Sequence, residues 1–189
     1  MADKKIALGE VFRNRRERSR VNLPILSVTM SSGLVRRDTL DRKNDTNLEC
    51  DEHLLVRTGD IAYNTMRMWQ GVSALSEHEG IVSPAYTVCI PGSKIDGRFA
   101  AYMFKYRPVV NQLFRYSQGL VDDTRNLKFR HFAEVPVAIP TLATQRRVSE
   151  VLNAVDRDTV LLERYRNTLH CQRIALMQGL LSMPIADSR

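Results

Sequence analysis

The sequence has 189 residues, and its 28 lysines and arginines against 21 aspartates and glutamates give a formal net charge of +7. Hydrophobic residues make up 43% and charged residues 26%, which excludes a disordered or low-complexity chain and permits one domain, or a domain with an appendage. Apolar runs stay far shorter than the roughly 20 residues of a membrane span, and the start lacks an apolar signal segment. We therefore expect a cytoplasmic protein with no membrane partner. The basic balance favours a polyanionic partner, nucleic acid first, although a solvated surface would carry the same charge.

Motifs typical of enzymes and metal centres are missing from the sequence. There is no P-loop, no glycine-rich dinucleotide turn, no zinc-protease helix and no nucleophile elbow. The cysteines, Cys50, Cys89 and Cys171, are far apart and have no paired spacing, so they predict neither disulfides nor a zinc site. The histidines are scattered as well. We expect no catalytic residue, no metal and no cofactor.

The start of the chain carries a run of arginines. Its members are Arg13, Arg15, Arg16, Arg18 and Arg20. Such a run predicts attraction to phosphates without sequence readout, and a plain solubilising surface is the alternative.

Short apolar or alternating runs, separated by turn residues, follow in the first 140 residues and are typical of strands. They cover residues 23–30, 53–56, 59–64, 82–90 and 135–139. These runs predict a mixed α/β fold with a curled mixed sheet or barrel. Residues 83–86 (SPAY) are interpreted as a turn before a strand, and residues 41–47 as the longest polar linker.

One helix is expected among these strands, over residues 99–116. Apolar side chains recur there at three-to-four spacing, namely Phe99, Met103, Tyr106, Val110 and Phe114. This spacing predicts a helix face that packs on the core.

A long helix is predicted over residues 145–183, which contain no proline and a single glycine. Thr141 is suited to cap its start, and Pro184 to end it. One apolar position repeats every seven residues, at Val148, Val155, Leu162, Leu169, Leu176 and Met183. At about 58 Å the helix exceeds what a small domain can cover, so we expect a coiled-coil homodimer along this seam. Packing back on its own domain is the alternative. The expected domains are residues 1–140 and 141–189.

Several segments keep an order that is specific in combination. They are GDIAYNTMRMWQG at residues 59–71, GIVSPAY at 80–86, SQG at 117–119, RNLK at 125–128, Phe132, the proline-flanked 136–140 and TLATQ at 141–145. In order and spacing they closely resemble the specificity subunit of type I restriction-modification systems. The resemblance covers residues from about 8 to 182.

The resemblance implies a target-recognition domain followed by a long helix. Members of that family usually carry two such units in tandem, with their two helices paired antiparallel to set the distance between two half-sites. This sequence departs by having one unit, so it resembles a half-size subunit for which self-pairing is the natural substitute. It also has Thr144 where the family commonly has glutamate, which weakens the capping box from Thr141.

Two segments are candidates for DNA contact within this resemblance. In the first, Arg67 can fork onto guanine, Gln70 can bridge adenine, and Trp69 can fill space or wedge. The alternative is a buried Trp69 that pins a hairpin, with Arg67 at its solvated rim. The second is a polar, basic loop suited to phosphates and base edges, and a solvated loop that needs no partner is the alternative. It contains Ser117, Gln118, Arg125, Asn126 and Lys128.

The function expected from this resemblance is a non-catalytic DNA-recognition subunit. It would place a methyltransferase subunit, and a motor nuclease subunit, on a bipartite site in double-stranded DNA. A stand-alone homodimeric DNA-binding regulator is the alternative, and an enzyme in its own right is the third possibility.

Overall fold

The computed structural model describes residues 5–19, 23–29, 33–39 and 52–182. Contacts divide the chain into two compact units, Met1–Arg147 and Val148–Arg189. All named strands belong to the first unit, and most of the described part of the second is the continuation of the long helix α4 (Leu142–Leu181). Arg20, Cys50, Met183, Pro184 and the linker at residues 41–47 lie outside the described residues.

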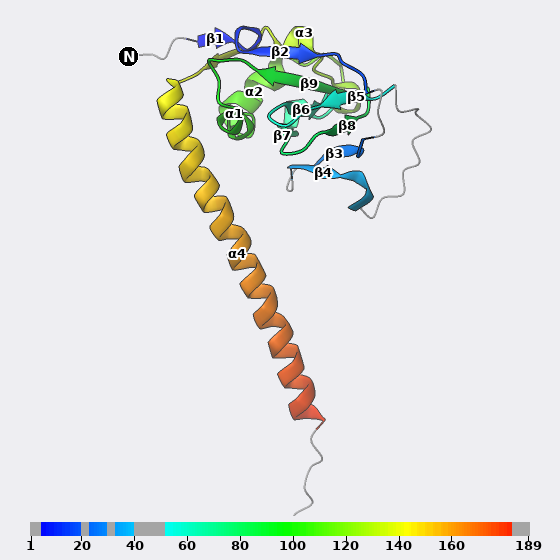
Figure 1. The fold of residues 1–189 in the computed structure, drawn as a ribbon, viewed down its shortest axis with the longest axis vertical. Coiled ribbons are helices and arrows are strands. Elements are labelled where there is room, and N and C mark those ends of the chain that lie inside the picture. The colour runs from blue at the N-terminus through cyan, green and yellow to red at the C-terminus, as the bar shows by residue number, and fades with distance from the viewer. Residues whose placement is uncertain (1–4, 20–22, 30–32, 40–51, 183–189) are drawn as a thin grey trace, which may run out of the picture. The chain divides into compact units, whose positions relative to one another are not determined.

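The central sheet of the first unit has four antiparallel strands in the order β2-β9-β6-β7 (Figure 1). They are β2 (Phe12–Arg15), β9 (Tyr86–Pro91), β6 (Ile61–Asn64) and β7 (Ser73–Leu75). Strand β9 begins after a turn in which Tyr86 N donates to Ser83 O at 3.0 Å, so the predicted turn is confirmed.

Three two-stranded antiparallel ladders accompany this sheet. They pair β1 (Lys5–Ala7) with β10 (Pro136–Ala138), β3 (Leu26–Thr29) with β4 (Gly33–Arg36), and β5 (Leu54–Val56) with β8 (Gly80–Val82). The predicted mixed α/β fold with a long C-terminal helix is confirmed. The sequence prediction missed strands β1, β2, β4 and β7, because none of them has more than two apolar residues in a row.

An aromatic cluster forms the centre of the larger hydrophobic core. The ring of Phe132 lies 5.2 Å from that of Tyr63 and 5.8 Å from that of Phe12, centroid to centroid. Phe132 belongs to α3 (Phe129–Phe132), whereas Tyr63 and Phe12 belong to strands β6 and β2 of the central sheet. The rings therefore hold the end of the polar loop before α3 against the sheet.

The helix expected over residues 99–116 is in fact two helices, α1 (Gly97–Met103) and α2 (Arg107–Tyr116). Pro108 causes the break, because it has no N–H and its ring would collide with the carbonyl group of Phe104 in a continuous helix. The chain instead becomes extended at Tyr106, whose ψ is 122°. The prediction of a single core-facing helix was therefore wrong, since Tyr106 is exposed and Phe114 is partly exposed.

The long helix α4 (Leu142–Leu181) is continuous over 40 residues, as Figure 1 shows. Thr141 precedes it, and its Oγ1 accepts a hydrogen bond of 3.4 Å from the N–H of Thr144. The hydroxyl groups of these two threonines lie 3.1 Å apart. The prediction of a long helix capped by Thr141 is thus confirmed. Among the described residues, no helix combines the length and the hydrophobicity that a bilayer span requires.

Candidate nucleic-acid interface

The two segments predicted to contact DNA lie side by side. The first, residues 65–71, connects β6 to β7, and the second, residues 117–128, connects α2 to α3. The N–H of Leu127 donates a hydrogen bond of 2.8 Å to the carbonyl oxygen of Thr65, which joins them. We call the part of these segments that is not fully buried the two-loop surface. Its predicted members are Arg67, Trp69, Gln70, Gln118, Arg125, Asn126 and Lys128.

The first segment folds into a short 3-10 helix, Met68–Gln70, that places Trp69 on the two-loop surface. The indole N–H of Trp69 donates to the carbonyl oxygen of Met66 at 2.9 Å. Gly71 ends this turn with φ of 80°, and a Cβ there would lie 2.6 Å from the carbonyl oxygen of Phe104. Glycine is therefore required here for both conformation and space. Trp69 is half-buried, whereas Arg67 and Gln70 are exposed.

Arg125 of the second segment stacks on aromatic rings from two other elements. Its guanidinium carbon lies 4.1 Å from the ring centroid of Phe114 on α2 and 5.8 Å from that of Trp69. The two rings are themselves 6.0 Å apart at an interplanar angle of 65°. Cation–π contacts of this kind hold a guanidinium group in place without using its N–H groups.

The hydrogen-bonding capacity of Arg125 is only partly used. Its Nε lies 3.4 Å from Asp122 Oδ1, but no described group accepts a hydrogen bond from Nε. The side chain is 15% exposed. Because Nε is buried, a base edge or a phosphate oxygen would be bound by the terminal N–H groups of this stacked cation.

The rest of the second segment is ordered by its own hydrogen bonds. Gln118 and Asn126 exchange two backbone hydrogen bonds of 2.7 Å each. Ser117 is buried, and its hydroxyl donates to the carbonyl oxygen of Leu113 at 2.8 Å, so we exclude it from the two-loop surface. Lys128 is exposed at the start of α3, where its carbonyl oxygen accepts from the N–H groups of His131 and Phe132.

Phe114 is the main residue of this region that sequence reasoning misplaced. Its helical spacing assigned it to the core, but it lies partly exposed beneath Arg125. The only sequence signal for its role is that it shares a helix with the residues just before the polar loop. Which ring an arginine will stack on depends on segments far apart in sequence.

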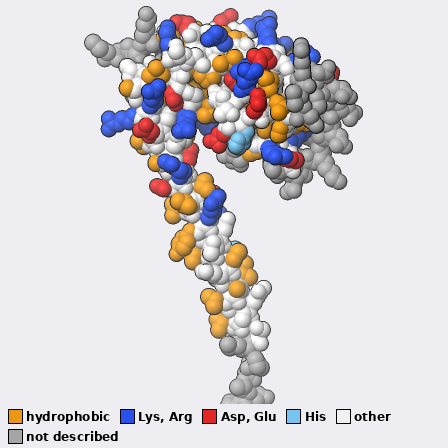
Figure 2. All heavy atoms as spheres, viewed as in Figure 1, with side chains coloured by type: hydrophobic (Ala, Val, Ile, Leu, Met, Phe, Trp, Pro, Cys, Tyr) orange, Lys and Arg blue, Asp and Glu red, His pale blue; other side chains and the backbone are white. Residues whose placement is uncertain are grey.

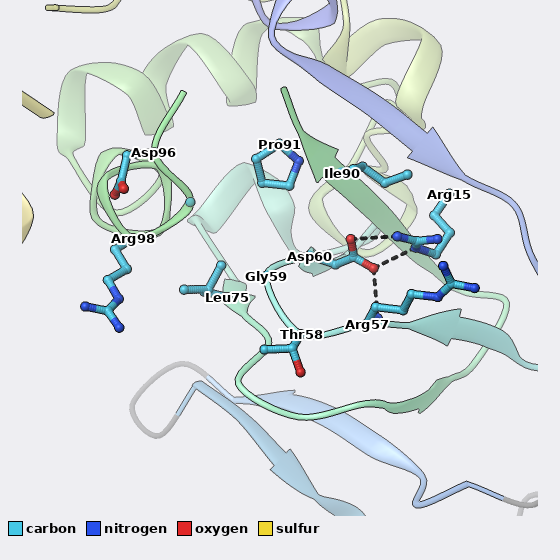
Figure 3. A pocket seen from close by; sticks show the side chains of 11 residues that line it. Arg15, Arg57, Thr58, Gly59, Asp60, Leu75, Ile90, Pro91, Asp96 and Arg98 are labelled. Atoms are coloured by element: carbon cyan, nitrogen blue, oxygen red, sulfur yellow. Dashed lines mark hydrogen bonds and ion pairs between the residues drawn. The ribbon is translucent and has the colours of Figure 1, made fainter. Parts of the chain in front are cut away.

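Arg15 has a structural role, which corrects its assignment to a phosphate-attracting run. Asp60 accepts hydrogen bonds from Arg15 Nε at 2.6 Å and Nη2 at 3.1 Å, and from the N–H of Arg57 at 2.8 Å (Figure 3). The Arg15 and Asp60 side chains are 8% and 4% exposed. The hydrogen bonds that Arg15 donates to Asp60 raise the pKa of Arg15 above its usual value despite burial. The ion pair ties β2 to the turn before β6.

This ion pair lines an open cavity of about 500 Å³ (Figure 3). Arg57, also in its wall, pairs with Glu17 at 3.0 Å. Because Arg15 and Arg57 already have acidic partners, the cavity walls are held together by internal ion pairs. Within the described residues, no group of His, Cys, Asp and Glu side chains is placed to hold a metal ion.

The predicted seam on α4 is exposed to solvent. Leu162, at its centre, is 67% exposed, and hydrophobic side chains line the helix in Figure 2. The described seam residues are Val148, Val155, Leu162, Leu169 and Leu176. Leu161, Tyr165 and Leu180 widen the same apolar face and are exposed as well. The predicted seam residue Met183 is not among the described residues.

Comparison with known proteins shows the fold. No family model matches the chain, and no curated protein matches it in sequence. Solved structures do match, among them a chain from a structure of the type I R-M system, at 15% identity, a TM-score of 0.62 and 94% coverage of this chain.

Two further solved structures are named as specificity subunits. The HsdS subunit from Thermoanaerobacter tengcongensis matches at 16% identity, a TM-score of 0.59 and 94% coverage of this chain. The type I restriction-modification S subunit from M. genitalium matches at 16% identity, a TM-score of 0.52 and 95% coverage.

The chain has the fold of part of a type I specificity subunit. It spans 44%, 43% and 46% of the lengths of these three structures, respectively. The fold expected from the order and spacing of the sequence motifs is therefore confirmed, and the similarity extends over nearly the whole chain.

Proposed function

We propose that this chain is a non-catalytic DNA-recognition subunit of a type I restriction-modification system. The observation that carries the proposal is the two-loop surface, in a chain with the fold of a specificity subunit. Its stacked Arg125 and its exposed Arg67, Gln70 and Lys128 offer forked and single donors to one ligand. These are the residue types that bind guanine, adenine and phosphate.

The subunit is proposed to act as a homodimer through α4. The chain spans less than half of the solved subunits that it matches, so two copies would supply a comparable length. The exposed seam offers five described apolar side chains at seven-residue spacing, and each contributes roughly 1.5–3 kcal/mol when fully buried. Such a gain is large beside the typical net stability of a domain.

The proposed target is a bipartite site in double-stranded DNA. If two identical helices pair antiparallel, a two-fold axis relates the two recognition domains, and the two half-sites are then inverted repeats with an unread spacer. A helix of about 60 Å bounds the half-site separation at roughly 17 base pairs, and about one turn, near 10 base pairs, would present both domains to the same side of the duplex.

The proposed protein partners are a methyltransferase subunit and a motor nuclease subunit, and the proposed location is the cytoplasm. A stand-alone homodimeric regulator would share the DNA surface and the helix pair but would need neither partner. The presence of a methyltransferase partner therefore distinguishes the two functions, whereas DNA binding does not.

The test is co-purification of the tagged chain with a type I methyltransferase subunit from the same organism, followed by selection of bound sites from random duplexes. We expect a stable complex that methylates a bipartite site, whereas the chain alone binds the site without methylating it. Specific binding without any methyltransferase complex would favour the regulator. Methyl transfer by the isolated chain would overturn the non-catalytic role.

A further inference from the structure

The tip of the second segment holds two apolar side chains in solvent. Leu120 is 100% exposed and Val121 is 58% exposed. An isolated exposed leucine is ordinary on a protein surface, so exposure by itself does not indicate a binding site. The position of Leu120 becomes informative through the loop that carries it.

That loop is narrow and closed by hydrogen bonds. The paired backbone bonds between Gln118 and Asn126 close its base. Near the tip, both the backbone N–H and the hydroxyl of Thr124 donate to the carbonyl oxygen of Val121, at 3.1 Å each. Leu120 therefore projects from a braced loop.

Gly119 allows the two sides of the loop to approach closely. Its φ is 130°, and a Cβ at this position would lie 2.7 Å from the Cα of Arg125. Leu120 follows this glycine directly, so the same closed loop carries Leu120 at its tip and the stacked Arg125 at its base. A ligand held by Arg125 would meet Leu120 at a fixed separation.

The charge around the tip is compatible with a DNA ligand. Asp122 lies beside Arg125, with 3.4 Å between Oδ1 and Nε, so its charge is compensated. Asp123 is exposed and adds one negative charge, which would keep it away from phosphates but allow it to accept from a cytosine amino group. Arg67 and Lys128 supply exposed positive charge on the two-loop surface.

We propose that Leu120 inserts into the base stack of the bound duplex as an apolar wedge, next to the bases that Arg125 contacts. Leucine is among the side chains that proteins insert between base steps, at the cost of partial unstacking. This inference rests on the proposed function. A weakened step is useful there, because an enzyme that methylates a base must first extrude it from the stack.

The test places 2-aminopurine, whose fluorescence rises when it is unstacked, at successive positions of the selected site. We expect the full-length wild-type chain to raise the fluorescence at one step by severalfold. Leu120→Ala should abolish the rise, Leu120→Met should retain it, and Val121→Ala on the same loop is the matched control. Since Leu120 is fully exposed, the thermal midpoint of unfolding should not change in Leu120→Ala.

The outcomes separate this proposal from the proposed function. Specific binding with no fluorescence rise at any position, or an unchanged rise with Leu120→Ala, would overturn the wedge and leave DNA recognition intact. Failure of the wild-type chain to discriminate between duplexes would refute the proposed function itself. If Leu120→Ala instead weakens only the complex with the methyltransferase subunit, the tip is a protein contact and the wedge is wrong.

Discussion

Gln145 Nε2 donates a hydrogen bond of 2.8 Å to the carbonyl oxygen of Pro140, the residue that ends the extended segment before α4. The same nitrogen donates to Lys94 O at 3.1 Å, and Gln145 Oε1 accepts from Asp96 N at 2.8 Å. One buried amide thus joins the first turn of α4 to the loop before α1.

Gln145→Ala should therefore lower the free energy of unfolding by at least about 2 kcal/mol, because each buried polar group left without a partner costs about 1–3 kcal/mol. Chemical denaturation with unchanged slope measures this loss. Ala143 and Thr144 precede Gln145 and are exposed, so Thr144→Ala is the control and should change stability by much less. Equal losses in the two variants would mean that the amide is not the joining element.

Asp60→Ala should destabilise the first unit strongly, since it leaves the buried Arg15 without its main partner. Breaking a buried ion pair typically costs about 3–5 kcal/mol. Glu17→Gln removes the exposed partner of Arg15 and should cost less than about 1 kcal/mol. A small effect of Asp60→Ala would show that Arg15 reaches solvent.

The stabilisation from Arg15 should not vary with pH near neutrality. Its pKa is raised in the folded state, so its contribution is fully present below the pKa of the unfolded arginine and is lost only as the pH rises through the folded value. The difference in unfolding free energy between wild type and Arg15→Ala should be constant from about pH 7 to about pH 9. A steady decline over that range would contradict the ion-pair assignment.

Arg125→Ala or Arg67→Ala should lower discrimination between the selected duplex and a scrambled one by about 1–3 kcal/mol, because a forked base contact is lost. Arg16→Ala, at an exposed position outside the two-loop surface, should weaken both duplexes equally and reduce the salt slope by about 1. Titrations of both duplexes at one fixed salt concentration measure the discrimination, and repeating them over a series of salt concentrations measures the slope. If all three variants lose affinity equally on both duplexes, the two-loop surface does not read sequence.

Leu162→Asp together with Leu169→Asp should dissociate the proposed dimer, since each variant places a charge in the seam. Sedimentation at micromolar concentration should show the mass of two chains for wild type and of one chain for the double variant. Asn167→Asp with Gln178→Asp adds the same charge outside the seam and should leave the dimer intact. A wild-type chain that sediments as a monomer would contradict the prediction.

Deleting one heptad, residues 162–168, should shorten the preferred spacer by about 3 base pairs, because seven residues span about 10.5 Å of helix. The apolar repeat stays in phase, so the helix pair should persist. A two-residue deletion turns the rest of the seam by about 200° around the helix axis, to the opposite face, and should dissociate it. A spacer that does not respond to the heptad deletion would show that α4 does not set the distance.

Local patterns were sufficient for the parts of this protein whose structure depends on neighbours in sequence. The seven-residue repeat and the absence of proline predicted α4, and Thr141 was correctly predicted as its cap. The turn at Ser83 was also predicted correctly, from the proline within it and from the apolar strand that comes after it. The same kind of signal was available for the break before α2, where Pro108 should have outweighed the apolar spacing.

Only the tertiary structure decided which polar side chains are buried and which are presented. Arg13 and Arg15 lie on the same short strand, yet Arg13 is exposed and Arg15 is buried against Asp60, which is 45 positions away. The stack of Arg125 on Phe114 and Trp69 unites a helix, a hairpin connection and a loop. Periodicity determines a helix because its hydrogen bonds join residues four positions apart. Ion pairs and aromatic stacks join residues at any separation, and only the folded chain defines them.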